Sequence, residues 1–411
     1  MWTRPTAPRL AVTSSTASAG KSGTSRELLG LMRALAAHTT RVDLAAIAPS
    51  GIERALEIGL GPVLAHVGDS AGVRFPQLFT DRIRAAELTS RALTAGKYDT
   101  ISEVLTAAGS IECRVILLKG AATALRYYPA PHLRPMGDVD VLVPADRQPL
   151  LEARLLALGF QQRSNQPADA FAGWHHSMPF HCLRRGTWID VHSSVYPPHH
   201  PHAQDPLFSW EAIISQLSPV TVGQQTAYVM NHELQLVFTS ARWAEEFDPA
   251  RGLYPILDAA LLIGMHRDTL DWDRILGIAG DSWAGTALYL MLSLLQRWEL
   301  ALVPPEVLTA MAAKDRHQNR VFFPLLYRLT ATYALEGRPF GLAATTEGHL
   351  RVVWSSLLRP CSPTANLFAI PFDLTFPPGH PERFSPFYAI RRVGAFLRRA
   401  MWKGAAPPYD A

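Results

Sequence analysis

Apolar residues recur every three or four positions from about residue 25 to residue 110, which is the pattern of amphipathic helices. The pattern is clearest in RELLGLMRALAAH, SGIERALEIGLGPVLAHV and DRIRAAELTSRALTAGKYDTISEVLTAAG. Ser50 opens the second of these stretches and is a suitable N-cap, because its hydroxyl can accept a hydrogen bond from the first helical turn. We therefore predict an N-terminal helical region over residues 25–110.

The pattern changes over residues 111–220, where short β-branched runs alternate with short helical stretches. CRVILLK and GDVDVLV have the composition of strands, whereas AATALRYY and PADRQPLLEARLLALGF have that of helices. HHSMPFHCLRR and TWIDVHSSVY, with Gly186 between them, predict a β-hairpin. The order strand, helix, strand, helix, strand, strand indicates a small mixed domain of the α/β or α+β kind.

Helical spacing returns over residues 221–337 and predicts a C-terminal helical domain. Residues 338–411 form a proline-rich tail that ends in a basic amphipathic helix, FYAIRRVGAFLRRAMWK. This helix either packs its apolar stripe on its own protein, which we favour, or binds an anionic membrane surface or a nucleic acid. Residues 1–24 are polar and acid-free, lack the apolar core of a secretory signal, and are expected to be a disordered leader.

Composition narrows the classes of protein that fit. The 411 residues are 48% hydrophobic, which is enough for a large core in two or three domains. No apolar run reaches the roughly 18–20 residues that span a bilayer. The three cysteines, at positions 113, 182 and 361, lack metal-ligand spacing and favour a reducing, cytoplasmic compartment. The net charge of +4 permits an anionic ligand, but it does not lead us to expect a nucleic acid partner.

Two aspartates stand in a run that otherwise resembles a buried strand. In GDVDVLV, Asp138 and Asp140 are two residues apart, so in a strand both would project from the same face. Two like charges this close raise each other's pKa unless a cation neutralises them. A hard divalent ion such as Mg²⁺ binds carboxylate oxygens and keeps positions open for phosphate oxygens.

A third aspartate, Asp190, lies in the apolar run TWIDVH and shares its face with Trp188 and His192. Three carboxylates from two strands can hold two metal ions about 4 Å apart, the arrangement used for phosphoryl or nucleotidyl transfer. A glycine after Lys119 begins the short helix that precedes the aspartates, and a helix N-terminus favours a phosphate group. Solvated aspartates at a strand end are the simpler alternative, which this context disfavours.

The segments LLKGAATALRYYP, LRPMGDVDVLV and WIDVH together resemble the uncharacterised bacterial nucleotidyltransferases of the DNA polymerase β-like superfamily. That superfamily has a glycine-serine turn that opens a helix, a D-x-D strand and a third acidic residue on a later strand. Here Gly120 and Ala121 stand in the place of glycine and serine, so the serine hydroxyl is missing. The resemblance implies an α+β fold, with a small mixed β-sheet nucleotidyltransferase domain between N- and C-terminal helical regions.

The resemblance also implies an enzyme of the nucleotidyltransferase (EC 2.7.7) type. Asp138 and Asp140 would hold the nucleotide-side Mg²⁺, and Asp190 would join them at a second Mg²⁺ and help to activate an acceptor hydroxyl. The hydroxyl of a small molecule, peptide or protein would attack the α-phosphorus of an NTP, with ATP expected, in a biosynthetic tailoring reaction. The alternative is a binding or antitoxin-like regulatory protein that keeps the fold. A weaker alternative is an enzyme that modifies RNA ends, which the modest net charge and the lack of a stretch with interleaved aromatic and basic residues disfavour. The residues implied in nucleotide binding are Lys119, Gly120, Ala121, Arg134 and His192.

Several further residues have two interpretations each. Arg134 could contact a phosphate or a metal-site carboxylate, or lie on the surface of a loop. His192 could orient Asp190 or touch the substrate, or be a hydrogen-bonded strand residue. Asp258 could face the nucleotide, or form a buried pair with Arg251. The remaining candidates are His175 and His176, which could line the same cleft, and the loop histidines His199, His200 and His202.

Overall fold

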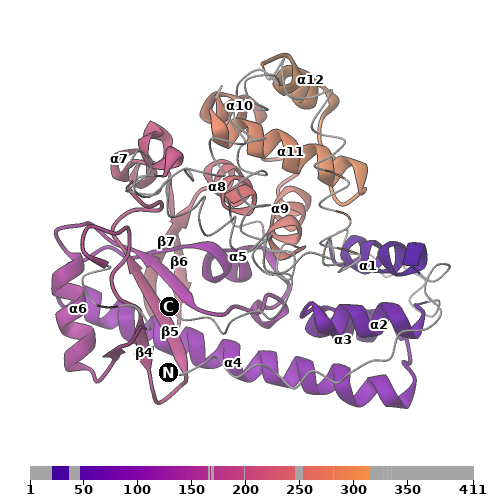
Figure 1. Cartoon of the computed structure of the whole chain (residues 1–411), viewed down its shortest axis with the longest axis horizontal. Coiled ribbons are helices and arrows are strands. Elements are labelled where there is room, and N and C mark those ends of the chain that lie inside the picture. Colours follow the sequence, from indigo (N-terminus) through magenta and orange to yellow (C-terminus); the bar gives the residue numbers. More distant parts are fainter. Residues whose placement is uncertain are drawn as a thin grey trace, which may run out of the picture.

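The computed structural model describes residues 21–36, 47–164, 167, 171–198, 200–245, 253–280 and 282–314, and the single positions 327, 331 and 335. The first 20 residues of the expected leader and the whole tail over 338–411, with its basic helix, lie outside the described residues. Figure 1 shows a β-sheet with the long helix α4 below it and a group of helices above it. The predicted α+β class with flanking helical regions is confirmed.

The sheet has seven strands in the order β3-β4-β5-β2-β1-β7-β6. Strand β2 runs parallel to β5 and antiparallel to β1, and β1 runs parallel to β7, so the sheet is mixed. The strands are β1 (Ile116–Leu117), β2 (Val139–Leu142), β3 (Gln161–Gln162), β4 (Phe180–Cys182), β5 (Thr187–His192), β6 (Leu217–Val222) and β7 (Gln225–Met230).

Alternation along β2 and β5 gives the sheet one apolar face and one polar face at its centre. Val139, Val141, Ile189 and Val191 are fully buried in a cluster with residues of α4 (Gln77–Gly109) and α6 (Gln148–Ala157). The residues between them therefore project from the opposite face, because successive side chains alternate. The apolar face fixes the sheet on α4 and α6, and the other face is left for chemistry.

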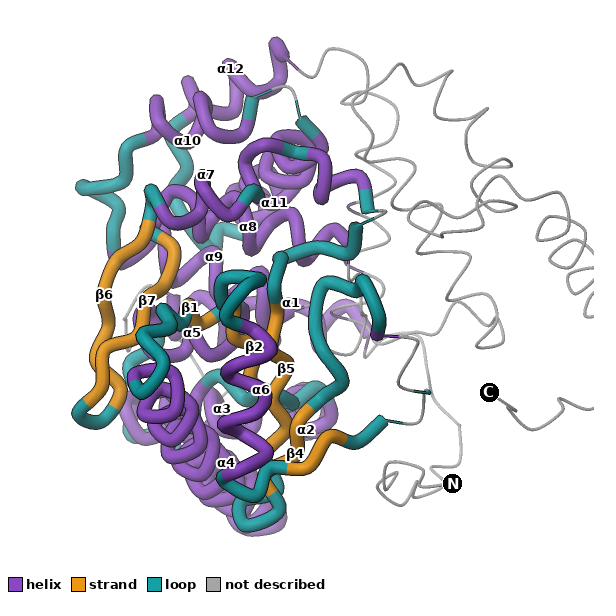
Figure 2. Tube along the Cα trace, turned by 90° about the vertical axis from the view of Figure 1, so that its left-hand side faces the viewer, coloured by secondary structure: helices purple, strands orange, loops and turns teal. Residues whose placement is uncertain are grey.

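Helix α4 belongs to two hydrophobic clusters. Phe79 and Ile83, in its first turns, pack in the cluster of the N- and C-terminal helices, whereas Ile101 and Val104 pack under the sheet. A single 33-residue helix thus connects the helical region to the sheet, as Figures 1 and 2 show. The other N-terminal helices are α1 (Lys21–Ala36), α2 (Pro49–Glu57) and α3 (Gly61–Ala71).

The C-terminal helices pack above the sheet around α9 (Leu253–Met265), of which ten residues are buried. This region is joined to the sheet through α8, which follows β7 directly. Among the described residues, no helix is both long and apolar enough to span a bilayer. The remaining elements are α5 (Lys119–Tyr127), α7 (Trp210–Ile214), α8 (His232–Glu245), α10 (Trp272–Ala279), α11 (Trp283–Arg297), α12 (Pro305–Lys314), η2 (Pro131–Leu133), η4 (Pro201–Gln204) and η5 (Pro206–Phe208).

The hairpin predicted around Gly186 is confirmed, with β4 and β5 antiparallel and Gly186 at a φ of 61°. A second hairpin, β6–β7, was not predicted, and it extends the sheet to Met230, beyond the boundary expected at residue 220. Its first strand contains Pro219, which argues against a strand in the sequence. Strand β6 lies at the edge of the sheet, where a residue without an N–H is tolerated.

Substitutions in α4 test how strongly the sheet depends on this helix. We expect Ile101→Ala to lower the free energy of unfolding by about 2–5 kcal/mol, because it opens a cavity at a fully buried position. Leu93→Ala, on the same helix but 52% exposed, should change it by no more than about 0.5 kcal/mol. Urea denaturation measures both, and equal effects would contradict the packing described.

Candidate functional site

Asp140 and Asp190 lie side by side on the polar face of the sheet. The parallel register of β2 and β5 pairs Asp140 with Asp190 directly, and it pairs Leu142 with His192. Asp140 is only 3% exposed and Asp190 is half-buried. Neighbouring strands are about 4.8 Å apart, so the two carboxylates emerge next to each other.

Asp140 is held as a carboxylate by two positive or donating groups. The Lys119 ammonium is 2.8 Å from its Oδ1, and His192 Nε2 donates to the same oxygen at 2.9 Å. Burial alone would raise the pKa of Asp140, but the charge of Lys119 and the bond from His192 outweigh it and leave the pKa below its usual range. Asp140 is therefore ionised at any physiological pH.

Asp190 has the opposite electrostatic environment. Burial, followed by the negative charges of Asp140 and Asp138, raises the pKa of Asp190 to about 7, and Lys119 only partly opposes the shift. Its carboxylate forms no hydrogen bond or ion pair within the part of the chain that the structure describes. A carboxyl group with this pKa is about half ionised at neutral pH, and a nearby cation would stabilise its charged form.

A group that could bind a metal ion forms at this place. Asp140, Asp190 and His192 each offer one ligand atom, and these atoms all lie within 4.8 Å of one another. Two carboxylates and an imidazole suit a divalent cation, and a cation bound there would oppose the burial and the neighbouring negative charges that raise the pKa of Asp190. The donor set therefore fits a metal ion.

Asp138 and His192 differ from their predicted roles in detail. Asp138 lies in the bend just before β2 and is not part of the three-residue group, although its charge acts on Asp190. His192 bonds Asp140, not Asp190, and its buried Nδ1 has no hydrogen-bond partner among the described residues. The strand begins one residue later than the D-x-D pattern implies, which is why Asp138 is set apart.

The start of α5 forms the second part of the site. Lys119 has a φ of 49°, a left-handed conformation that lysine rarely adopts and that is held here by the surrounding structure. Leu118 occupies the N-cap position and offers no side-chain acceptor to the first turn. Gly120 permits a close approach, because a Cβ there would lie 2.8 Å from Cγ of Met136. These features leave a helix N-terminus suited to an anion next to Asp140.

Ala121 is 2% exposed and packs in the cluster beneath the sheet. Its carbonyl accepts a hydrogen bond from the Tyr98 hydroxyl at 3.2 Å. The Ala121 side chain thus faces the core, and only the main chain at this position is available to a nucleotide.

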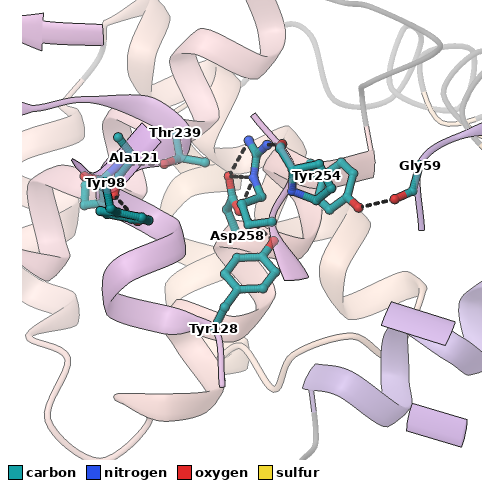
Figure 3. Close-up of polar contacts among 10 residues, drawn as sticks. Gly59, Tyr98, Ala121, Tyr128, Thr239, Tyr254 and Asp258 are labelled. Atoms are coloured by element: carbon teal, nitrogen blue, oxygen red, sulfur yellow. Dashed lines mark hydrogen bonds and ion pairs between the residues drawn. The ribbon is translucent and has the colours of Figure 1, made fainter. Parts of the chain in front are cut away.

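Arg134 forms a buried ion pair with Asp258 that connects three parts of the chain. Figure 3 shows Asp258 together with Tyr128, Tyr254 and Gly59. The Arg134 guanidinium donates to both carboxylate oxygens of Asp258 on α9 at 2.9–3.1 Å, and Tyr128 donates to the same carboxylate at 2.7 Å. Arg134 also lies 4.8 Å from the ring centroid of Tyr254, whose hydroxyl donates to the Gly59 carbonyl. Since Asp258 occupies the guanidinium, we leave Arg134 out of the proposed nucleotide contacts. Arg251 lies outside the described residues.

Lys97 is a site residue that the sequence analysis missed. It is 6% exposed on α4, where burial lowers its pKa and the nearby charge of Asp138 opposes this effect. Polar residues recur with helical spacing on this face of the helix, but only the structure shows that they are buried. They are Glu87, Ser90, Thr94 and Lys97.

Three histidine rings lie against one another beside Asp140. The rings of His175 and His176 are each 5.2 Å from that of His192, measured between centroids. His176 Nδ1 lies 2.7 Å from the Ser177 carbonyl, which can only accept, so the neutral ring carries its lone pair on Nε2. His200 and His202 instead pack on Tyr196, and His199 lies outside the described residues.

Paired carboxylates beside a helix N-terminus define a site suited to metal-assisted transfer of phosphate groups. A family model described as "Uncharacterised nucleotidyltransferase" matches residues 53–299, and the chain belongs to this family. Membership supports a nucleotidyl transfer activity. No curated protein matches the chain. The solved structure of an antigenic nucleotidyltransferase-like protein from Paracoccidioides brasiliensis is 16% identical, covers 54% of this chain and 94% of its own, and has a TM-score of 0.33. A TM-score of this size carries no argument about the site.

The raised pKa of Asp190 predicts a pH dependence of stability in metal-free protein. Because the folded pKa of about 7 exceeds the unfolded value of about 4, protonation of Asp190 favours the folded state. Its contribution is complete below pH of about 4 and is lost as the pH rises through about 7. Thermal melting in EDTA should show Asp190→Asn losing less stability than the wild type over this range.

Adding Mg²⁺ at pH of about 8 should restore stability to the wild type and not to Asp190→Asn. The prediction is wrong if the melting temperatures of the two proteins change with pH by the same amount over this range. That result would mean that Asp190 has an ordinary pKa.

The Arg134–Asp258 pair predicts a large loss of stability on mutation. Asp258→Asn should lower the free energy of unfolding by about 3–5 kcal/mol, because it leaves a buried guanidinium without its counter-charge. Glu53→Gln, which breaks the exposed pair with Arg82, should cost less than about 1 kcal/mol. Urea denaturation measures the free energy of unfolding of the two variants. A loss at Asp258→Asn as small as that at Glu53→Gln would contradict the burial of the pair.

Proposed function

We propose that this protein is a Mg²⁺-dependent nucleotidyltransferase that moves an NMP group from an NTP, with ATP expected, to a hydroxyl acceptor. The observation that carries the proposal is the direct pairing of Asp140 with Asp190 on the polar face of the sheet, beside the start of α5. Membership of the nucleotidyltransferase family supports the general reaction. The likeness of its motifs to the DNA polymerase β-like superfamily is part of the same proposal.

Asp140 and Asp190, with Asp138 at the entrance to β2, would hold the metal. Carboxylate oxygens are the ligands that Mg²⁺ prefers, and His192 fixes the orientation of Asp140 through its bond to Oδ1. When bound, Mg²⁺ supplies positive charge to the phosphate oxygens and promotes ionisation of the acceptor hydroxyl.

The triphosphate would lie at the start of α5. The first-turn N–H groups after Leu118 point along the helix axis, and the helix dipole favours a negative group there. Lys119 adds a charge whose side chain is 28% exposed and therefore accessible to a ligand while it pairs with Asp140. Gly120 lets Met136 pack closely against the first turn of this helix.

Asp190 would accept the proton of the acceptor. Its pKa of about 7 belongs to the metal-free site, and a bound cation would lower this pKa and keep Asp190 ionised to receive the proton. The acceptor oxygen then forms its bond to the α-phosphorus, the bond to the bridging oxygen breaks, and pyrophosphate leaves. Asp140, which stays ionised, would remain a ligand of the metal throughout.

Two further points concern the cell and the acceptor. Cys113 and Cys182 are buried free thiols, which support the proposed cytoplasmic location. We propose an acceptor among small molecules, peptides or proteins with a hydroxyl group, as expected of a biosynthetic tailoring enzyme.

Replacing either paired aspartate tests the reaction. Asp140→Asn and Asp190→Asn should each lower pyrophosphate release from an NTP by about a hundredfold or more, since each removes a metal ligand. Asp146→Asn is a matched control, because its carboxylate follows β2 but is 78% exposed and outside the group, and it should keep full activity. Transfer of label from α-³²P NTP to an acceptor provides the second measurement.

Circular dichroism must show that the inactive variants are folded. Unchanged turnover in both aspartate variants would overturn the proposal. Partner binding with no turnover in the wild type would favour the regulatory alternative.

A further inference from the structure

Trp188 and His181 form a stacked pair on the same face of the sheet as Asp190. The two residues are opposite each other in the β4–β5 pairing. Their ring centroids are 4.3 Å apart and the rings are nearly parallel, with an angle of 21° between their planes. Trp188 is 36% exposed, although tryptophan in a central part of a sheet is usually covered. We call this pair the Trp188–His181 platform.

The platform lies next to the paired carboxylates, on the side away from α5. Trp188 precedes Asp190 by two residues, which is about 7 Å along a strand, and both project from one face. The strand order β4-β5-β2-β1 places the platform on one side of Asp140 and Asp190, and α5, which follows β1, on the other. A triphosphate at α5 and a ligand on the platform would therefore meet at the two aspartates.

A positive side chain accompanies the platform. The Arg163 N–H donates to the Pro179 carbonyl at 3.0 Å, which continues the β3–β4 ladder by one step. Gln161 pairs with His181, so Arg163, two residues later, projects from the same face and is exposed. Its guanidinium is close enough to act on the charge of His181.

Another exposed aromatic residue lies toward the other end of β5. Trp174 is 38% exposed, and its ring is 5.2 Å from that of His175, which is 5.2 Å from the ring of His192. Among the described residues, Trp174 and Trp188 are the exposed aromatic side chains, and both adjoin the strand that carries Asp190. Aromatic rings on a functional face, with a basic residue nearby, are suited to stacking of bases.

We propose that the Trp188–His181 platform binds the base of the acceptor, so that the acceptor is a nucleoside or nucleotide whose ribose hydroxyl faces Asp190. This inference rests on the proposed function and specifies its acceptor. The base stacks on the exposed face of Trp188, and Arg163 pairs with a phosphate group attached to the acceptor. The acceptor hydroxyl loses its proton to Asp190, its oxygen bonds to the α-phosphorus of the NTP, and pyrophosphate leaves. The proposal departs from the sequence-based expectation of no nucleic acid partner.

The test is a binding measurement on the full chain. The protein is saturated with Mg²⁺ and an NTP analogue that carries a methylene group between the α- and β-phosphorus, which fills the donor site and blocks transfer. Isothermal titration calorimetry then measures the binding of three probes, namely adenosine, AMP and a short single-stranded RNA with a free 3′-hydroxyl. The variants are Trp188→Ala, Trp188→Phe and Arg163→Ala, with Leu183→Ala as a control in the same hairpin that is 49% exposed.

We expect Trp188→Ala to weaken all three probes by about tenfold, as loss of one base stack should. Trp188→Phe keeps a ring and should retain most of the affinity, and Leu183→Ala should have no effect. Arg163→Ala should weaken AMP and the RNA but leave adenosine unchanged. An RNA affinity well above that of AMP identifies an RNA end as the source of the acceptor, and equal affinities identify a free nucleotide.

Three results would overturn the inference. One is probe binding that does not depend on Trp188. Another is an equal loss of affinity for the NTP analogue in Trp188→Ala, which would assign the platform to the donor base. The third is Trp188-dependent binding of a hexose with none of adenosine, which would make the platform a sugar site.

The outcomes also separate this inference from the proposed function. If the probes bind in a Trp188-dependent way but the protein releases no pyrophosphate, the proposed base-binding platform stands and the proposed transfer reaction fails. If the protein transfers label and the KM for the acceptor is the same in Trp188→Ala and the wild type, the proposed reaction stands. The proposed role of the platform then fails.

Discussion

The parallel pairing of β2 with β5 is the constraint on which the site depends. It brings Asp140 and Asp190, which are 50 positions apart in the chain, into direct register on one face of the sheet. The opposite face of the same strands is apolar and buried against α4 and α6. If either strand shifted its register by one residue, its carboxylate would point into that core. The packing that stabilises the sheet therefore also specifies where the charges lie.

Different electrostatic environments give the two aspartates different properties. Asp140 receives the Lys119 ammonium and a bond from His192, so it is a permanent anion. Asp190 is buried beside that anion without a comparable partner, and its pKa rises to about 7. Two side chains of the same type thereby respond differently to a cation: Asp140 is ionised with or without it, and Asp190 becomes fully ionised at neutral pH only when a cation is bound.

The elements around the pair divide the face of the sheet into two sides. The strained Lys119 and the uncapped start of α5 lie on one side, and the Trp188–His181 platform lies on the other. The loop between α5 and β2 is held from above by Arg134, which pairs with Asp258 on α9, and this links the helical region to the site. The C-terminal helices therefore contribute to the geometry of the site without supplying the paired carboxylates.

The sequence by itself determined most of the element types and the shared face of Asp190 and His192 within one strand, because strand alternation and helical spacing are local properties. That Asp140 joins them was decided by the pairing of β2 with β5. It did not reveal the β6–β7 hairpin, since Pro219 argues against a strand unless that strand is known to be at an edge. It also left open which partners Arg134, His192 and Lys97 would find. Those choices were decided by the tertiary structure, because the partner of Arg134 lies 124 positions away and Lys97 acts on Asp138 from α4, a distant part of the chain. A local pattern carries no information about which distant charge will be buried beside a given side chain.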